Sequence, residues 1–204
     1  TACEDINSST LPYTEDFNTY GTGSASNFPI CWHRGYTTSS ASPYISSTGG
    51  GSLYFYGSPG TYSYATTEAL DNSISLNNLM LSFKLYKGSA AYNIKVGVME
   101  DYEDASTFET IATLSPTATS TWEDFDITFE EYTGSGRYIA FMVDGRGGND
   151  SKYMYLDDVV LQYTPTCRRV HNLTANEITS DGATISWTEM GSATSWDIAV
   201  DSAG

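Results

Sequence analysis

Apolar and polar residues alternate with a period of two along several stretches of the chain. In residues 79–86 (LMLSFKLY), positions 79, 81, 83 and 85 are apolar and share one face, and the intervening positions share the other. Residues 92–99 and 124–129 follow the same pattern. This period is typical of β-strands that bury one face and leave the other in water, as antiparallel sheets allow.

Further strands are expected at 11–17, 53–57, 107–114 and 153–163, and residues 138–143 (YIAFMV) are apolar on both faces, as in a central strand. Glycine-rich turn segments separate these strands, and no amphipathic helix of ten or more residues is expected. Many short strands joined by such turns are typical of a sandwich. The sequence therefore predicts an all-β fold, a jelly-roll β-sandwich with a partial β unit after it.

The composition changes after Tyr163. Residues 164–170 contain a proline and two adjacent arginines, which indicates a linker between a first domain at 1–163 and a second unit at 171–204. The second unit has strand patterns at 173–178, 183–187 and 196–200, whereas a sandwich normally needs about seven strands. We therefore expect part of a β domain, which must lean on the first domain, pair with another chain or be poorly ordered.

The charge balance of the chain is strongly acidic. Nine basic residues face 25 acidic ones, for a net charge of −16. Phosphate backbones and anionic membranes repel such a surface, so nucleic acid is excluded as an expected partner. No run approaches the ~20 apolar residues of a membrane helix, so no membrane insertion is expected. The excess of carboxylates indicates solubility or the binding of a cation.

Motifs that carry catalysis are absent from the sequence. It has no HExxH zinc motif, no GxSxG nucleophile elbow, no P-loop and no GxGxxG. Its two histidines, His33 and His171, fall in different predicted domains. We expect no enzymatic activity. A jelly-roll glycoside hydrolase is kept as an alternative, since that chemistry needs only two carboxylates at a set separation.

An ordered set of short motifs carries a family resemblance. In order along the chain these are LPYTEDF (11–17), FPICW (28–32), SLYFYG (52–57), KVGVMED (95–101), TWEDFDITF (121–129), GRYIAFMV (136–143) and LDDVVL (156–161). Together they resemble the cleaved-adhesin or choice-of-anchor J jelly-roll domain, which is similar to the adhesin modules of gingipains and haemagglutinins and more distantly to MAM domains. The resemblance covers residues 3–163.

Residues 172–189 look like the first strands of a fibronectin type III domain, with Trp187 as its core tryptophan, although the later strands are lacking. The two resemblances imply a non-catalytic binding module of a secreted or surface-attached bacterial protein. Such a module mediates adhesion to glycans or to host extracellular proteins and is joined to further domains of the same polypeptide. The alternative is a structural spacer.

A calcium site is expected where the two ends of the first domain meet. Terminal strands of jelly rolls commonly lie side by side, which would bring Glu15 and Asp16 near Asp157 and Asp158. Carboxylates at such short distances repel each other. Calcium, which prefers oxygen ligands, relieves this repulsion. The resemblance supports the same site, because related jelly rolls hold a structural calcium there. The alternative is four solvated carboxylates.

A second oxygen-rich segment, DGRGGND, contains Asp144, Asn149 and Asp150. It lacks the spacing of an EF-hand and is more typical of a turn than of a metal site.

Three cysteines, Cys3, Cys31 and Cys167, allow three pairings. Antiparallel pairing of the terminal strands would bring Cys3 and Cys167 to one end of the domain, so a Cys3–Cys167 disulfide is predicted. Cys3–Cys31 and no bridge are the alternatives. Cys31 and its neighbour Trp32 are expected to pack as core residues.

Aromatic residues are abundant, with 16 Tyr, 8 Phe and 4 Trp. Sugars stack on aromatic faces, so a cluster of tyrosines is a candidate glycan platform. Its candidate members are Tyr36, Tyr44, Tyr54, Tyr56, Tyr62 and Tyr64. The alternative is structural, because tyrosine suits half-buried strand positions.

Overall fold

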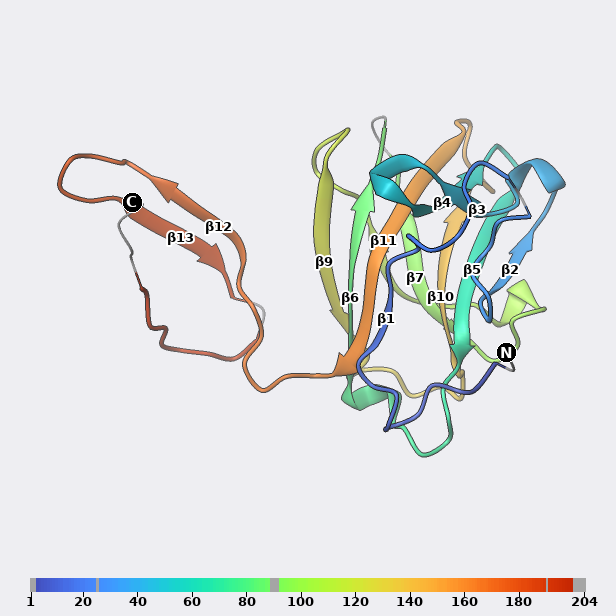
Figure 1. The fold of residues 1–204 in the computed structure, drawn as a ribbon, viewed down its shortest axis with the longest axis horizontal. Helices are drawn as coiled ribbons and strands as arrows, with labels where there is room; N and C mark the ends of the chain where they lie inside the picture. The colour runs from blue at the N-terminus through green and yellow to red at the C-terminus, as the bar shows by residue number, and fades with distance from the viewer. Residues whose placement is uncertain (1–2, 25, 89–91, 190, 200–204) are drawn as a thin grey trace. The chain divides into compact units, whose positions relative to one another are not determined.

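The computed structural model describes residues 3–24, 26–88, 92–189 and 191–199. Its chain divides into two compact units, Thr1–Tyr163 and Thr164–Gly204. Unit 1 is a sandwich of two antiparallel sheets and unit 2 is a two-stranded hairpin (Figure 1). The prediction of an all-β sandwich is therefore confirmed.

The first sheet of unit 1 has the strand order β3-β4-β11-β6-β9, with β1 also paired to β11. We call it sheet I. Its strands are β1 (Tyr13–Glu15), β3 (Tyr44–Ser46), β4 (Ser52–Gly57), β6 (Leu79–Tyr86), β9 (Trp122–Thr128) and β11 (Lys152–Tyr163).

The second sheet, called sheet II, has the order β2-β5-β10-β7-β8. Its strands are β2 (His33–Tyr36), β5 (Tyr62–Ala69), β7 (Ile94–Met99), β8 (Glu109–Leu114) and β10 (Tyr138–Asp144). Short 3-10 turns join some of the strands: η1 (Ser39–Ala41), η2 (Thr48–Gly50), η3 (Leu76–Asn78) and η4 (Ala105–Thr107). Among the described residues, no helix is long and apolar enough to cross a membrane.

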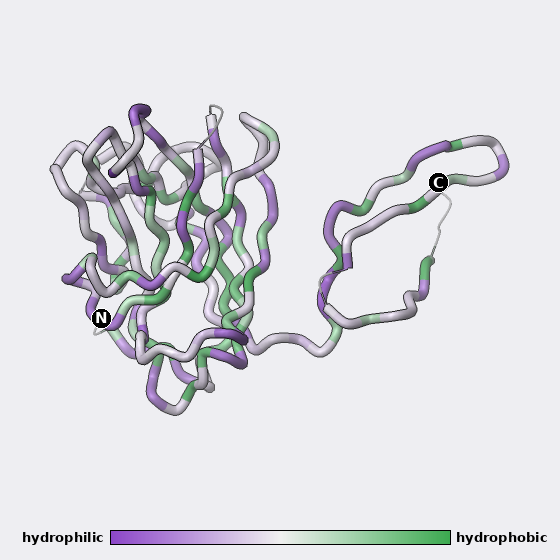
Figure 2. The backbone as a smooth tube through the Cα atoms, turned by 180° about the vertical axis from the view of Figure 1, so that it is seen from behind, coloured by the Kyte–Doolittle hydropathy of each residue, from purple (hydrophilic) through white to green (hydrophobic). Residues whose placement is uncertain are grey.

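The core lies between the two sheets, where the predicted apolar faces meet. The apolar positions of β6, Leu79, Leu81, Phe83 and Leu85, are all buried, and they pack with Val96 and Val98 of β7 and Phe141 of β10. Figure 2 shows hydrophobic residues recurring along these strands. Trp32 belongs to this core, as predicted, and stacks on Phe141 with ring centroids 6.4 Å apart.

Strand β5 was not predicted, because buried polar and apolar residues follow one another in it without alternation. Tyr64 and Ala65 are buried beside Ser63, Thr66 and Thr67, which are fully buried polar residues. Their hydroxyl groups are satisfied locally: Thr66 donates to the carbonyl of Thr67, and Ser63 accepts from the amide of Tyr56. Buried hydroxyls that are hydrogen-bonded in this way cost the fold little.

The outer face of sheet II is covered at its centre, which agrees with the prediction that 138–143 is apolar on both faces and differs from the expectation that 92–99 has one solvent-exposed face. Residues 100–108 cross it and bury a second apolar cluster that contains Met99, Ala140 and Met142. Gly97 allows this closeness, because a Cβ at this position would lie 2.8 Å from the ring of Phe108. Sheet II is therefore buried on both faces at its centre.

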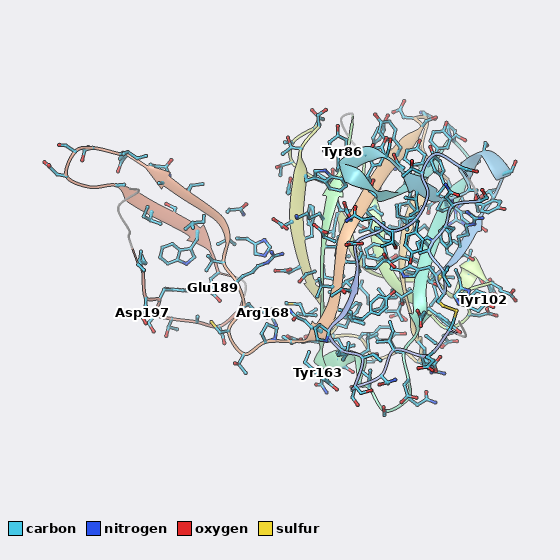
Figure 3. The ribbon with its side chains drawn as sticks, in the orientation of Figure 1. Tyr86, Tyr102, Tyr163, Arg168, Glu189 and Asp197 are labelled. Carbon is cyan, nitrogen blue, oxygen red and sulfur yellow. A yellow bond between two sulfur atoms is a disulfide. The ribbon has the colours of Figure 1, made fainter. Side chains whose placement is uncertain are left out.

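The disulfide prediction was wrong. Cys3 bonds Cys31, and Cys167 is a free, exposed thiol in unit 2 (Figure 3). The N-terminal segment does not continue β1 toward the end of β11. Instead Ile6 bridges Leu70, which carries Cys3 toward the start of β2.

Unit 2 consists of β12 (His171–Asn176) and β13 (Thr184–Thr188), paired antiparallel. The third strand expected at 196–200 does not form in residues 196–199, and residue 200 lies outside the described residues. Trp187 packs edge-on against Trp196, with ring centroids 5.3 Å apart. The relation of unit 2 to fibronectin type III domains stays a prediction.

The disulfide assignment makes a prediction for stability. Replacing Cys3 with Ser should lower the free energy of unfolding by about 3 kcal/mol, because the bond closes a loop across a sequence separation of 28 residues. Cys167→Ser is the matched control and should change stability by less than about 0.5 kcal/mol. Urea unfolding of both variants measures the difference. A peptide map that links Cys3 to Cys167 would contradict the assignment.

Candidate functional site

A row of aromatic side chains crosses the outer face of sheet I. The register pairs Tyr44 with Tyr54, Tyr54 with Tyr155, Tyr155 with Tyr86, and Tyr86 with Trp122. The row therefore takes one residue from each of five adjacent strands, β3, β4, β11, β6 and β9. These residues alternate with the buried core positions of their strands, so their side chains point away from the core. We call this set the aromatic row.

Neighbouring rings of the aromatic row are in contact. Their centroids are 5.0 Å apart for Tyr44 and Tyr54, and 5.1 Å for Tyr54 and Tyr155. The distance is 5.5 Å from Tyr155 to Tyr86 and 5.4 Å from Tyr86 to Trp122. Figure 3 labels Tyr86 near the upper end of the sandwich. All five side chains are partly exposed, and burial raises the pKa of Tyr54 above its usual value.

A second tier of tyrosines lies beside the row. Tyr153 is in register with Tyr56 and contacts Tyr54 and Tyr92, with centroids 6.1 and 5.2 Å away. The hydroxyl of Tyr56 donates to Ser151 at 3.1 Å. The aromatic surface is therefore two residues wide along β4 and β11.

The loop between β3 and β4 crosses the outer face of sheet I, because it contacts Trp122 in β9, at the opposite edge of the sheet from β3. At Gly49 a Cβ would lie 2.7 Å from Cζ2 of Trp122, and the backbone there is in the left-handed region with φ 73°. Only glycine combines that φ with so close an approach to the indole. The loop thus holds the Trp122 ring in place.

The six tyrosines predicted as a glycan platform do not form one site. Tyr44, Tyr54 and Tyr56 lie on sheet I, as described. Tyr62 and Tyr64 lie in β5 of sheet II, where they stack on each other with centroids 6.0 Å apart. Tyr64 is buried and donates to the carbonyl of Tyr102 at 2.7 Å, so it holds the covering segment 100–108.

The remaining predicted member, Tyr36 in β2, is exposed and far from the row in the strand order, since β2 is the edge strand of sheet II. Sequence reasoning missed Tyr86, Trp122, Tyr153 and Tyr155. A signal was present for Tyr86, Tyr153 and Tyr155, which occupy outward positions of predicted strands, whereas Trp122 lies before the predicted strand at 124–129. What was missing was the register that places them side by side.

The two ends of unit 1 meet as predicted at β1 and β11. Glu15 is opposite Val159 and Tyr13 is opposite Leu161. A depression of about 480 Å³ at this junction is lined by residues that include Glu15, Asp16 and Asp158. Glu15 accepts hydrogen bonds from the amide of Phe17 at 2.8 Å and from the hydroxyl of Tyr20 at 2.8 Å.

A β-bulge in β11 separates the two neighbouring aspartates. The register to β6 shifts between Asp157 and Val160, and Asp158 has a left-handed backbone with φ 49°. Asp157 is consequently buried, with 8% of its surface exposed, and Asp158 is exposed and forms an ion pair with Lys84 at 2.8 Å. Burial raises the pKa of Asp157 to about 7, and the carboxylates of Asp158 and Asp16 add to the rise.

The donors at this junction are oxygen atoms, the type that calcium prefers. Their arrangement is not that of a finished metal centre. Within the described residues, no group of three or more His, Cys, Asp or Glu side chains is arranged to hold a metal ion. The Lys84 ion pair draws Asp158 outward, so bound calcium would require Asp158 to leave Lys84 or backbone oxygens to complete the ligands. The calcium assignment stays a prediction.

Asp144, at the second oxygen-rich segment, is already neutralised by cations. Its carboxylate accepts from Lys95 at 2.9 Å and from Arg146 at 2.9 Å. Although burial opposes the effect, these hydrogen bonds lower the pKa of Asp144. It therefore serves as an anchor for the 145–151 turn.

No protein-family model matches the chain, and no curated protein matches it. Several solved structures are similar to it. The K1 cleaved adhesin domain of Lys-gingipain from Porphyromonas gingivalis W83 is 19% identical, with 76% of this chain and 99% of that one covered, at a TM-score of 0.53. The K2 cleaved adhesin domain of Lys-gingipain is 13% identical, with the same coverage and a TM-score of 0.54.

A family 11 carbohydrate-binding module of a cellulase from Clostridium thermocellum is also similar, at 15% identity. The match covers 71% of this chain and 95% of the module, at a TM-score of 0.44. This similarity is too low to bear on a ligand. The likeness to the gingipain domains defines the fold. The resemblance of residues 3–163 to cleaved adhesin domains is thus confirmed at the level of structure.

The raised pKa of Asp157 predicts a pH dependence of stability in the presence of a chelator. The folded protein holds this proton more tightly than the unfolded chain, whose pKa is near 3.8. The stability that the proton confers is therefore present below a pH of about 4 and is lost as the pH rises to about 7. Asp157→Asn keeps the shape without the charge and should remove this part of the loss. Melting curves between pH 4 and 8 that stay parallel for both proteins would contradict it.

Proposed function

We propose that residues 1–163 form a non-catalytic, glycan-binding module of a secreted or cell-surface protein. The aromatic row is the observation that carries the proposal. Five partly exposed rings in one line are what the apolar C–H faces of sugars stack on, and the tyrosine hydroxyls beside them are available to hydrogen-bond the sugar rims. Binding sites typically combine such an apolar surface with a few polar groups.

The row also suits a binding surface because it is held rigid. The strands fix the spacing of the rings, and the Gly49 backbone supports Trp122 from the loop side. Side chains that are already ordered lose little further entropy when a ligand binds. The outer face of sheet II is occupied at its centre by residues 100–108, and on sheet I the 47–51 loop lies against the Trp122 end of the row.

We further propose that calcium braces this module at the junction of β1 and β11. Glu15, Asp16 and Asp158, which line the depression, would hold the ion, together with Asp157, whose buried carboxylate is close enough to interact with the charges of Asp158 and Asp16. The ion would supply positive charge between carboxylates that otherwise repel one another. Its role here is structural, since it would tie the first strand of the unit to the last.

The glycan proposal predicts the effect of removing single rings. Trp122→Ala or Tyr86→Ala should weaken binding to a recognised polysaccharide about tenfold each, which corresponds to about 1.4 kcal/mol. Tyr36→Ala is the matched control, since this exposed tyrosine lies on sheet II, and should leave binding unchanged. A glycan-array screen followed by isothermal titration calorimetry measures the affinities, with circular dichroism to verify folding. Equal losses in all three variants would contradict the assignment.

If no glycan binds, the alternatives are a module that binds a host protein and a structural spacer. Binding of a host protein is tested with the same tyrosine variants against a captured extracellular protein. A spacer would bind neither.

The calcium proposal predicts a ligand-dependent melting temperature. Calcium at a hundredfold excess over its dissociation constant should stabilise the folded protein by about 2.7 kcal/mol. Asp157→Asn should abolish this response, and Asp150→Asn, in the 145–151 turn, is the control that should retain it. Differential scanning calorimetry with calcium and with EDTA provides the measurement. An unchanged melting temperature in the unmodified protein would refute the calcium site.

A further inference from the structure

The aromatic row has a direction and a length, and both restrict its ligand. It runs across the strands, which are spaced about 4.8 Å apart, so the five rings span about 19 Å. The centroid spacings of 5.0 to 5.5 Å are close to the length of one hexopyranose unit in an extended polysaccharide. A ligand that contacts the whole row must therefore be an extended chain of four or more sugars.

The rings are not coplanar. Neighbouring planes are inclined by 50°, 52°, 80° and 51° from Tyr44 to Trp122. A crystalline polysaccharide presents a flat surface, and only coplanar rings can all lie against it. A single chain in solution can turn from one sugar to the next and follow an inclined set of rings. The geometry thus favours a soluble chain over a crystal face.

The charges of unit 1 disfavour an anionic chain. Residues 1–163 contain seven lysines and arginines, and each already has a hydrogen-bond or ion-pair partner within the unit. Lys84, whose strand also carries Tyr86 of the row, is paired with Asp158, and Lys87 is buried against Ser115. Arg34 donates to the carbonyl of Pro43, and Arg137 donates to the carboxylate of Asp5 and the carbonyl of Leu70. The remaining three, Lys95, Arg146 and Lys152, all donate to Asp144.

Carboxylates, in contrast, border the row. Asp124 lies on the same face of β9 as Trp122, opposite Lys84 in the register, and Asp126 follows on that face. An anionic sugar on the row would lie near these carboxylates, and Lys84 beside them is already paired with Asp158. Like charges brought together oppose binding.

We infer that the aromatic row binds a single, soluble, uncharged polysaccharide chain of at least four sugar units, which lies across the strands from Tyr44 to Trp122. The inference rests on the proposed glycan-binding function and specifies its ligand class.

The test uses the 204-residue chain and three sets of probes. The first is a ladder of neutral β-linked glucan, xylan and mannan oligosaccharides from two to six units with the parent soluble polysaccharides. The second is polygalacturonate, alginate and heparin. The third is microcrystalline cellulose and chitin. Calorimetry measures the soluble probes, and sedimentation with the solid measures the crystalline ones.

The expected result is that a neutral polysaccharide binds, that its hexasaccharide binds at least about tenfold more tightly than its disaccharide, and that sodium chloride changes the affinity little. The acidic polymers and the crystalline solids should not bind. Tyr44→Ala and Trp122→Ala, at the two ends of the row, should reduce hexasaccharide affinity and leave disaccharide affinity nearly unchanged. Tyr36→Ala controls for the loss of a tyrosine elsewhere.

The outcomes separate this inference from the proposed function. Binding of none of the probes would overturn both. Binding of an acidic polymer that weakens with salt, retention on crystalline solid, or equal affinity for disaccharide and hexasaccharide would overturn the inferred ligand class and leave glycan binding intact. Unchanged affinity in both end variants would show that the ligand does not span the row.

Discussion

The hydrogen bonding of β11 is the constraint on which the rest of unit 1 depends. This strand of 12 residues pairs with β6 along one edge, and with β4 and then β1 along the other. It therefore fixes the register of three other strands. The aromatic row exists because Tyr155 of β11 is in register with Tyr54 on one side and with Tyr86 on the other.

The bulge at Asp157 and Asp158 divides β11 into two halves with different roles. Before it, Met154 and Leu156 are the core positions, and after it Val159 and Leu161 are. The extra residue shifts the alternation by one, as bulges do. The first half thus presents tyrosines to the outer face, and the second half closes the sandwich against β1, with the carboxylates at the junction.

Much of the architecture could be predicted from the sequence, since period-two alternation identifies strands that have one apolar face. Strand β6 begins and ends where the alternation does, at Leu79 and Tyr86. The prediction failed for β5, where buried hydroxyl and apolar side chains do not alternate. It succeeded for 138–143 but gave 92–99 one exposed face, because local periodicity carries no information about the segment 100–108 that covers it. The junction of Glu15 and Asp16 with β11 was predictable from the fold, whereas the register that assembles the aromatic row was not. Pairings between distant strands depend on the whole sheet rather than on any one strand. The disulfide prediction was wrong for the same reason, since the path of residues 3–12 determines that Cys3 lies beside Cys31.

The segment 100–108 that lies over sheet II affects the valency of the module. Because it occupies the centre of one of the two outer faces, unit 1 offers the aromatic row on one side only, and the proposed glycan site would hold one chain at a time. Cross-linking of two polysaccharide chains, or agglutination of the particles that bear them, would then require two copies of the domain. Tandem repetition or oligomerisation would raise the avidity by increasing the effective concentration of the second site, without any new contact within a single domain.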